Sequence, residues 1–164
     1  MGVVEMKILI VYDTFYGNTQ KVAESLNDYL KDFNPDLIKI DVLTQEQITN
    51  TDVFIVGSPT RAFTMTAKIK RAIKKNDFQN KFFFAFDTRA NMADITSKFL
   101  LKLANKFGYA AEKMEAKLIN KGAKKLLDYK AYYVKDSEGP LYQEVDNQIK
   151  EHATLLIEKI RKLT

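Results

Sequence analysis

The sequence has 164 residues, of which 46% are hydrophobic and 29% are charged, and its net charge at pH 7 is +5. This composition is typical of a water-soluble globular protein, and the length suits one domain, residues 1–164. The chain has no cysteine, which excludes disulfides, cysteine-ligated metal clusters and thiol nucleophiles. Its one histidine, His152, argues against a multi-histidine metal site and a serine–histidine–acid triad. We therefore predict no metal site.

Location and partners follow from the same bulk properties. No apolar run approaches the roughly 20 residues that a membrane-spanning helix needs, so we expect no membrane span. The first residues lack the basic and apolar segments of a secretory signal, and we expect a cytoplasmic protein. Several lysines between residues 117 and 130 could attract an anionic partner. Because no nucleic-acid-binding motif accompanies them, we expect no specific nucleic-acid recognition.

The first predicted element is a strand at Met6–Tyr12, whose mostly apolar run is typical of a parallel strand covered on both faces. A helix is predicted next, because Val22, Leu26 and Leu30 recur at helical spacing. The loop at 14–19 therefore lies at a helix N-terminus. Free backbone N–H groups and the helix dipole favour an anion such as phosphate at this place.

Hydroxyl groups in this loop, those of Thr14, Tyr16 and Thr19, could add donors to a phosphate. The alternative is an ordinary strand-to-helix turn in which Asn18 or Thr19 caps the helix. The loop by itself does not decide between these two interpretations.

Strands and helices alternate along the rest of the chain, which predicts a parallel sheet covered on both sides. The predicted strands are Leu37–Leu43, Val53–Gly57 and Lys81–Asp87, and the predicted helices are Ala67–Lys75, Asp94–Phe107 and Tyr142–Leu163. For the fifth strand we expect an interrupted edge strand, with Lys113–Ile119 and Ala131–Val134 as its candidate pieces.

The loops after the third and fourth strands are rich in hydroxyl and amide groups. They are 58–66, which also contains Phe63, and 87–94. In an open parallel sheet, ligands bind beyond the carboxyl ends of the strands, where these loops meet the loop at 14–19. A planar ligand with a phosphate tail would fit this combination.

At this point the chain resembles the flavodoxin-like family over nearly its full length. The loop Thr14–Thr19 is similar to the family's phosphate-binding motif, with Tyr16 at a position where the family has threonine. The segments Gly57–Thr60 and Gly139–Leu141 are similar to two further family segments. The resemblance implies an α/β doubly wound sandwich, a five-stranded parallel sheet in the order 2-1-3-4-5 with helices on both faces, and FMN as the cofactor.

The resemblance also implies which residues contact FMN. The FMN phosphate would bind Thr14–Thr19, and the loops at 60–63 and 87–91 would flank the isoalloxazine ring. The predicted cofactor-binding residues are Thr14, Phe15, Tyr16, Gly17, Asn18, Thr19, Pro59, Thr60, Arg61, Ala62, Phe63, Asp87, Thr88, Arg89 and Asn91.

Two departures from the family bear on function. Flavodoxins commonly cover the outer face of the flavin with a tyrosine from the loop that corresponds to 87–94, whereas this loop has no aromatic residue. One ring face would then be open, and Phe63, Phe15 or Tyr16 could stack on the other.

The second departure is charge, because carrier flavodoxins are usually acidic and residues 61–75 contain six basic residues and no acidic one. Arg61 and Arg89 near the site would favour the anionic two-electron-reduced flavin and raise its potential. Alternatively, these arginines pair with the FMN phosphate, Asp13 or Asp87.

The leading hypothesis is an FMN-binding electron carrier that serves redox partner proteins, among which the basic chain favours acidic ones. No side chain need be catalytic in such a carrier. The alternative is an FMN-dependent oxidoreductase that reduces a quinone or another small molecule. Another alternative is a flavin-free adaptor, and a receiver domain is disfavoured because Gly57–Pro59 replaces its aspartate. We expect a monomer or a homodimer.

Overall fold

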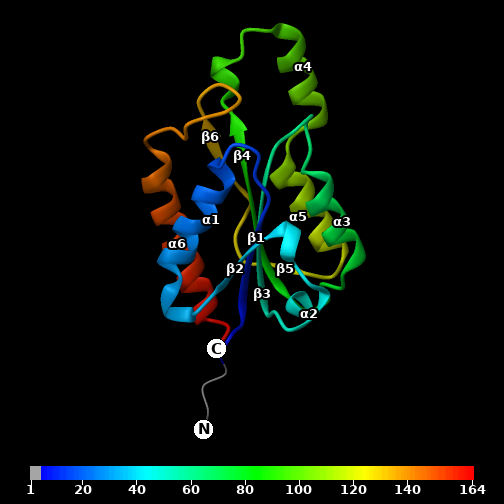
Figure 1. Ribbon diagram of the computed structural model, residues 1–164, viewed down its shortest axis with the longest axis vertical. Helices are drawn as coiled ribbons and strands as arrows, with labels where there is room; N and C mark the ends of the chain where they lie inside the picture. The colour runs from blue at the N-terminus through cyan, green and yellow to red at the C-terminus, as the bar shows by residue number, and fades with distance from the viewer. Residues whose placement is uncertain (1–4) are drawn as a thin grey trace.

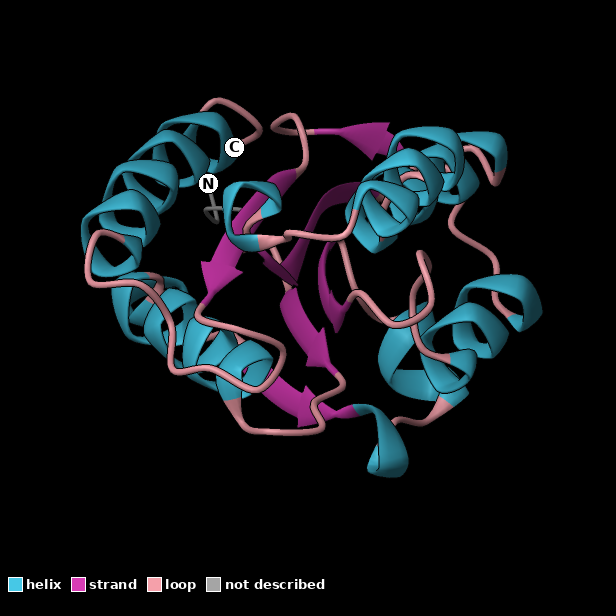
Figure 2. Cartoon of the chain, turned by 90° about the horizontal axis from the view of Figure 1, so that it is seen from above, coloured by secondary structure: helices cyan, strands magenta, loops and turns pink. Residues whose placement is uncertain are grey.

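A parallel sheet forms the centre of the structure, and helices cover both of its faces (Figures 1 and 2). The computed structural model describes residues 5–164. The strands are β1 (Ile8–Tyr12), β2 (Asp36–Lys39), β3 (Val53–Pro59), β4 (Phe82–Ala90), β5 (Lys124–Lys125) and β6 (Lys130–Val134). The α-helices are α1 (Asn18–Tyr29), α2 (Gln45–Thr49), α3 (Ala67–Lys75), α4 (Lys98–Phe107), α5 (Ala110–Asn120) and α6 (Val145–Arg161). Short 3₁₀ helices are η1 (Lys31–Phe33), η2 (Ile40–Val42) and η3 (Met92–Asp94).

The strand order is β2-β1-β3-β4-β5, and β6 also pairs with β4. Every pair of named strands is parallel. The predicted fold class and the order 2-1-3-4-5 are therefore confirmed, with two short strands in the fifth position. The carboxyl ends of the strands point to the end of the molecule where α4 lies (Figure 1).

Two apolar layers hold the helices against the sheet. Neighbouring residues of a strand face opposite sides, so Ile10 packs in the layer with Leu26 of α1 and Leu156 of α6. Val11 packs in the other layer, with Ile69 of α3 and further residues of α5. All of these side chains are buried. Burial on both faces explains why β1 is apolar without alternation.

The edge strand beside β4 is interrupted, as predicted, but one of its predicted pieces is wrong. β5 and β6 lie beside successive parts of β4, and residues 126–129 separate them. Lys113–Ile119 is not a strand and lies within α5. Its alternation competes with a helical pattern, because Ala110, Ala111, Met114 and Leu118 recur at helical spacing and are buried.

Several boundaries differ from the predictions. β2 ends at Lys39 because η2 follows it, and α2 was not predicted. β4 extends to Ala90, so the residues predicted to begin a loop at Asp87 still belong to the strand. α4 begins only at Lys98, where the side chain of Ser97 accepts a hydrogen bond from the N–H of Leu100. α6 is shorter than predicted at both ends.

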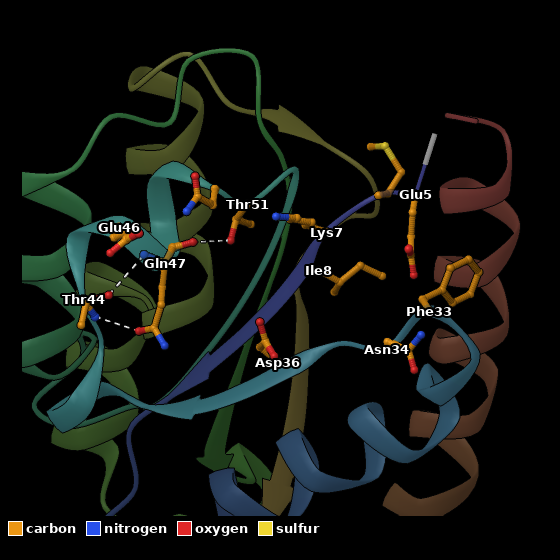
Figure 3. A pocket seen from close by; sticks show the side chains of 12 residues that line it. Glu5, Lys7, Ile8, Phe33, Asn34, Asp36, Thr44, Glu46, Gln47 and Thr51 are labelled. Carbon is orange, nitrogen blue, oxygen red and sulfur yellow. Dashed lines mark hydrogen bonds between the residues drawn. The ribbon is translucent and has the colours of Figure 1, made fainter. Parts of the chain in front are cut away.

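A hollow of about 420 Å³ lies where β1 and β2 begin, at the end of the sheet opposite the carboxyl ends of the strands (Figure 3). Thr44 and Gln47 at its rim form a capping box, in which each side chain accepts from the other residue's backbone N–H. Ligands in open parallel sheets bind at the carboxyl ends instead. We therefore expect the candidate site at the carboxyl ends of the strands. No helix within residues 5–164 is long and apolar enough to cross a membrane.

Candidate functional site

The loop between β1 and α1 leaves backbone donors free at the start of the helix. Gly17 is the N-cap, with φ of 88°, and no side chain among the described residues 5–164 caps the start of α1. The alternative in which Asn18 or Thr19 caps the helix is therefore wrong. Within residues 5–164, no protein group accepts from the N–H groups of Phe15, Tyr16 or Asn18. These donors and the dipole of α1 favour an anion here.

Hydrogen bonds fix the shape of this loop. The hydroxyl of Thr14 accepts from the N–H of Gly17 at 2.9 Å, and the carboxylate of Asp13 accepts from the N–H of Thr14 at 2.9 Å. The side-chain amide of Asn18 donates to the carbonyl of Glu138 at 2.8 Å. A Cβ at Gly139, where φ is 101°, would lie 2.6 Å from that amide. The loop after β6 can therefore close over Asn18 only with glycine at position 139.

Two buried hydroxyls lie next to the loop. Those of Thr19, on α1, and Thr88, on β4, are 2.8 Å apart. Whichever hydroxyl donates to the other, the second keeps its own proton free for another acceptor. The pair therefore offers one further donor to an anion.

A small cavity of about 110 Å³ joins these elements. Its lining includes the predicted residues Thr14, Phe15, Tyr16, Asn18, Thr19, Pro59, Thr60, Arg61, Thr88 and Arg89. The structure adds Ala90, which lies within the predicted segment 87–91, and Val134 and Ser137, which sequence analysis missed. The topology gives the signal that would have found Ser137. It follows β6, whose carboxyl end lies at the same edge of the sheet as that of β4.

A larger apolar cavity of about 350 Å³ shares Thr60, Arg89 and Ala90 with the small one. Its other lining residues are Ala62, Phe63, Ile95, Leu100, Ala104 and Tyr109. The two cavities place a polar, hydroxyl-lined space beside an apolar one.

Tyr109 supplies the aromatic side chain that the loop at 87–94 lacks. It lies just before α5, and sequence analysis did not place it at the site. The guanidinium carbon of Arg89 lies 3.8 Å from the centre of its ring. Phe63 lines the same apolar cavity. Two aromatic side chains from distant segments therefore border the cavity.

Asp87 holds Arg89 in place. Its carboxylate accepts two hydrogen bonds from the Arg89 guanidinium, at 2.8 and 2.7 Å. It also accepts from the hydroxyl of Thr60 at 3.1 Å and from the N–H of Ala111 at 2.9 Å. Asp87 is fully buried. This carboxylate therefore links β4 to the β3–α3 loop and to the start of α5.

Arg89 is a compensated charge. Burial would lower the pKa of Arg89, but the hydrogen bonds to Asp87 and the charges of Asp87 and Glu112 raise the pKa overall. Glu112 lies 3.6 Å from the guanidinium. Because two carboxylates neutralise it, Arg89 adds little net positive potential to the site. Of the alternative partners considered for Arg89, Asp87 is the one that it contacts.

Arg61 differs from Arg89, because it is exposed. Its guanidinium lies over the rings of Phe15, at 4.9 Å from the ring centre, and Tyr16, at 5.6 Å. No carboxylate within residues 5–164 forms an ion pair with it. Arg61 is therefore the cation that can act on a ligand in the small cavity.

The β3–α3 loop contains a two-residue turn. Arg61 and Thr64 exchange two backbone hydrogen bonds, at 2.9 and 3.1 Å. Between them, Ala62 and Phe63 have φ of 47° and 65°, which side chains adopt at a cost. The side chain of Lys113 donates to the carbonyl of Phe63 at 2.5 Å. This contact helps to hold the turn against α5.

Some predicted site residues lie outside both cavities. Asp87 faces Arg89, and Gly17 shapes the loop. The side chain of Asn91 accepts from the N–H of Ala93 at 3.0 Å and so caps η3. These three residues do not line either cavity.

The sequence model of the flavodoxin family matches residues 10–153. The chain belongs to the flavodoxin family. A flavodoxin from Aquifex aeolicus (strain VF5) is 34% identical over 68 residues, which cover 40% of this chain and 37% of that protein. The match therefore spans just over a third of this curated relative.

Two solved structures share the fold over nearly the whole of this chain. A flavodoxin from the domain Archaea has a TM-score of 0.71 at 17% identity, over 95% of this chain and 99% of the other. The metal-soaked Flv1 flavodiiron core from Synechocystis sp. PCC6803 has a TM-score of 0.73 at 18% identity, over 98% of this chain and 37% of the other. The flavodoxin fold thus occurs both as a separate protein and as part of a larger one.

Proposed function

We propose that this protein binds FMN and transfers electrons between redox partner proteins through the flavin. The observation that carries this proposal is the uncapped start of α1, where free N–H groups meet the hydroxyls of Thr14, Thr19 and Thr88. Membership of the flavodoxin family supports the same cofactor. A flavin-free adaptor would have no need of such a donor set.

The residues present fit FMN in two parts. Neutral and backbone donors around the small cavity suit a phosphate, and Arg61 adds positive charge nearby. The apolar cavity, with Phe63 and Tyr109, suits an isoalloxazine ring. Bound FMN would supply the electron-transfer chemistry, and the protein would supply binding, orientation and charge. We further propose a cytoplasmic protein, acting as a monomer or a homodimer.

Flavin titration tests the cofactor assignment. Apoprotein should bind FMN more tightly than riboflavin, which lacks the phosphate. Replacing Thr14 by alanine and Thr19 by valine should weaken FMN binding at least about a hundredfold, because hydrogen bonds to a charged group are each worth about 1.5–3 kcal/mol. Riboflavin binding should change much less.

The matched control is Thr154→Val, which removes a hydroxyl on α6 that donates to the carbonyl of Lys150. It should leave the affinity for FMN unchanged. If the double variant binds FMN as tightly as the original protein, the phosphate does not bind in this loop.

An FMN-dependent oxidoreductase is the second candidate. The apolar cavity favours it, because this cavity could admit a quinone if the flavin ring leaves part of it open. Stopped-flow measurements with NADPH and a quinone separate the two functions. Rapid turnover without a protein partner would support the enzyme, whereas slow turnover with rapid electron transfer to a redox protein would support the carrier.

A further inference from the structure

The helix α4 carries an apolar stripe whose two ends are exposed. The stripe consists of Phe99, Leu103 and Phe107, which follow one another at intervals of four residues. Phe99 is 70% exposed and Phe107 is 47% exposed. Helices of globular proteins normally turn such a stripe toward the core. Within α4, however, only Ala104 is buried.

A stripe of lysines runs directly beside the apolar one. Lys98, Lys102 and Lys106 each precede one residue of the apolar stripe, and all three are exposed. α4 contains no acidic residue, and no carboxylate within residues 5–164 forms an ion pair with these lysines. Their positive charge is therefore available to a partner. α3, on the same side of the sheet, is also basic and has no acidic residue.

The position of α4 connects these stripes to the candidate site. Figure 1 shows α4 at the end of the molecule, beyond the carboxyl end of β4. Leu100 and Ala104 line the apolar cavity, and the ring of Phe107 lies 6.0 Å from that of Phe63. A protein that binds α4 would therefore lie beside the cavity proposed for the flavin ring.

We propose that α4 is the docking element for an acidic redox protein, whose carboxylates meet the lysine stripe and whose apolar centre covers the apolar stripe. This inference rests on the proposed function, because it assumes that electrons leave from the adjacent cavity. Complementary charge would steer the partner to this end of the molecule, and the aromatic side chains would hold it there.

The observations favour a protein over a membrane surface as the occupant. Helices that lie in a membrane interface present a broad apolar face, and many have 20–30 residues. α4 has 10 residues, and lysines border its exposed apolar side chains, which are Phe99, Leu100 and Phe107. Its place at the rim of a cavity also fits a partner that must approach a buried group closely.

Electron transfer to two probe proteins of opposite charge tests the proposal. The FMN-loaded protein is reduced and mixed either with cytochrome b5, an acidic haem protein, or with cytochrome c, a basic one. Transfer to the acidic protein should be fast at low salt and should slow as salt is added. Transfer to the basic protein should show the opposite dependence on salt.

The charge variant replaces three lysines by glutamine, and its matched control does the same on α6 and at its C-cap. The variant is Lys98→Gln/Lys102→Gln/Lys106→Gln, and the control is Lys150→Gln/Lys159→Gln/Lys162→Gln. Both lose the same net charge. At low salt the variant should transfer electrons to cytochrome b5 about tenfold more slowly, whereas the control should change less than twofold. Equal loss in both would overturn the proposal, because net charge alone would explain it.

The apolar stripe is tested with Phe99→Ala, with Leu155→Ala on α6 as the control, since both side chains are well exposed. Phe99→Ala should weaken the complex with cytochrome b5 about tenfold, and the control should not. If α4 instead binds anionic lipid vesicles while transfer is unaffected, or holds two copies of this chain together in sedimentation, the proposal is wrong.

A further measurement separates this inference from the proposed function. Binding of cytochrome b5 to the apoprotein can be followed by NMR, and the affected amides should map to α4. Docking without any FMN binding would refute the proposed function alone. Normal FMN binding without effects at α4 would refute the docking proposal alone.

Discussion

The two walls of the candidate site differ in how the protein holds them. At the wall formed by the β1–α1 loop, Asn18 and Thr19 are 7% and 1% exposed, and their side chains bond to segments far away in the sequence. At the wall formed by α4, only Ala104 is buried, and Phe99 is largely exposed. The polar end of the site thus consists of buried, hydrogen-bonded residues, whereas the apolar end is bordered by a largely exposed helix.

This difference indicates how the two walls can change. A substitution in the β1–α1 loop alters buried hydrogen bonds, so it affects stability as well as binding. A substitution on the exposed side of α4 removes few contacts within the protein. The α4 wall can therefore acquire new partner specificity at little cost to the fold.

Among the substitutions considered, the loss of Asp87 should have the largest effect on stability. It holds the start of α5 through the N–H of Ala111 and the β3–α3 loop through the hydroxyl of Thr60, and it neutralises Arg89. Asp87→Ala should lower the free energy of unfolding by about 3–5 kcal/mol, because the buried guanidinium loses its main partner. Urea denaturation measures the effect.

Two further variants control this prediction. Asp128→Ala removes an exposed carboxylate that pairs with Lys125 and should cost much less stability, because water screens exposed ion pairs. Adding Arg89→Met to Asp87→Ala should restore part of the lost stability. A loss near 1 kcal/mol for Asp87→Ala alone would show that the hydrogen bonds of Asp87 contribute little to holding these segments together.

Most of the fold was predictable because each central strand begins with a short, largely apolar run. β1, β3 and β4 are buried on both faces, so their composition alone marks them. The strand at the edge of the sheet beside β4 was harder to predict. Residues 113–119 satisfy strand alternation and helical spacing at once, and tertiary packing of Met114 and Leu118 decides for the helix.

The site was predictable where one continuous segment builds it. The motif Thr14–Thr19 identified the polar cavity, which residues from three further segments complete. Tyr109 could not be found in this way, because it reaches the site through the packing of α5 against β4. For Arg89, sequence analysis left the FMN phosphate, Asp13 and Asp87 open as partners, and only the folded structure shows that Asp87 lies beside it.

Two cations, one in the β3–α3 loop and one in α3, can be compared through the flavin potential. Arg61 is uncompensated, whereas Lys68 is bonded to Asp41. If Arg61 lies about 10 Å from the flavin ring, Arg61→Gln should lower the potential for forming the anionic reduced flavin by about 20–70 mV, depending on screening. Lys68→Gln, the matched control, should change it much less. Spectroelectrochemical titration measures both, and equal shifts would contradict the assignment of Arg61 as the acting cation.

The smallest expected effect concerns His152, which belongs to neither wall. It tests whether the site is independent of the rest of the core. His152 on α6 places Nδ1 2.8 Å from the hydroxyl of Tyr132 on β6. Burial, aided by the charge of Lys130, lowers the pKa of His152 below its ordinary 6.5, although Glu151 opposes this. As the pH falls through 6.5, the unfolded chain binds a proton that the folded protein does not, so stability decreases.

Unfolding in urea between pH 7.5 and pH 5.5 should therefore show a smaller loss of stability for His152→Gln than for the original protein. Carboxylates contribute to the slope in both, so the difference between the two isolates the histidine. The pH dependence of FMN affinity should be the same in both proteins, because His152 lines neither cavity. A change in the pH dependence of FMN affinity would show that the α6 side of the core is coupled to the phosphate end of the site. The two walls could then not be considered apart from the rest of the core.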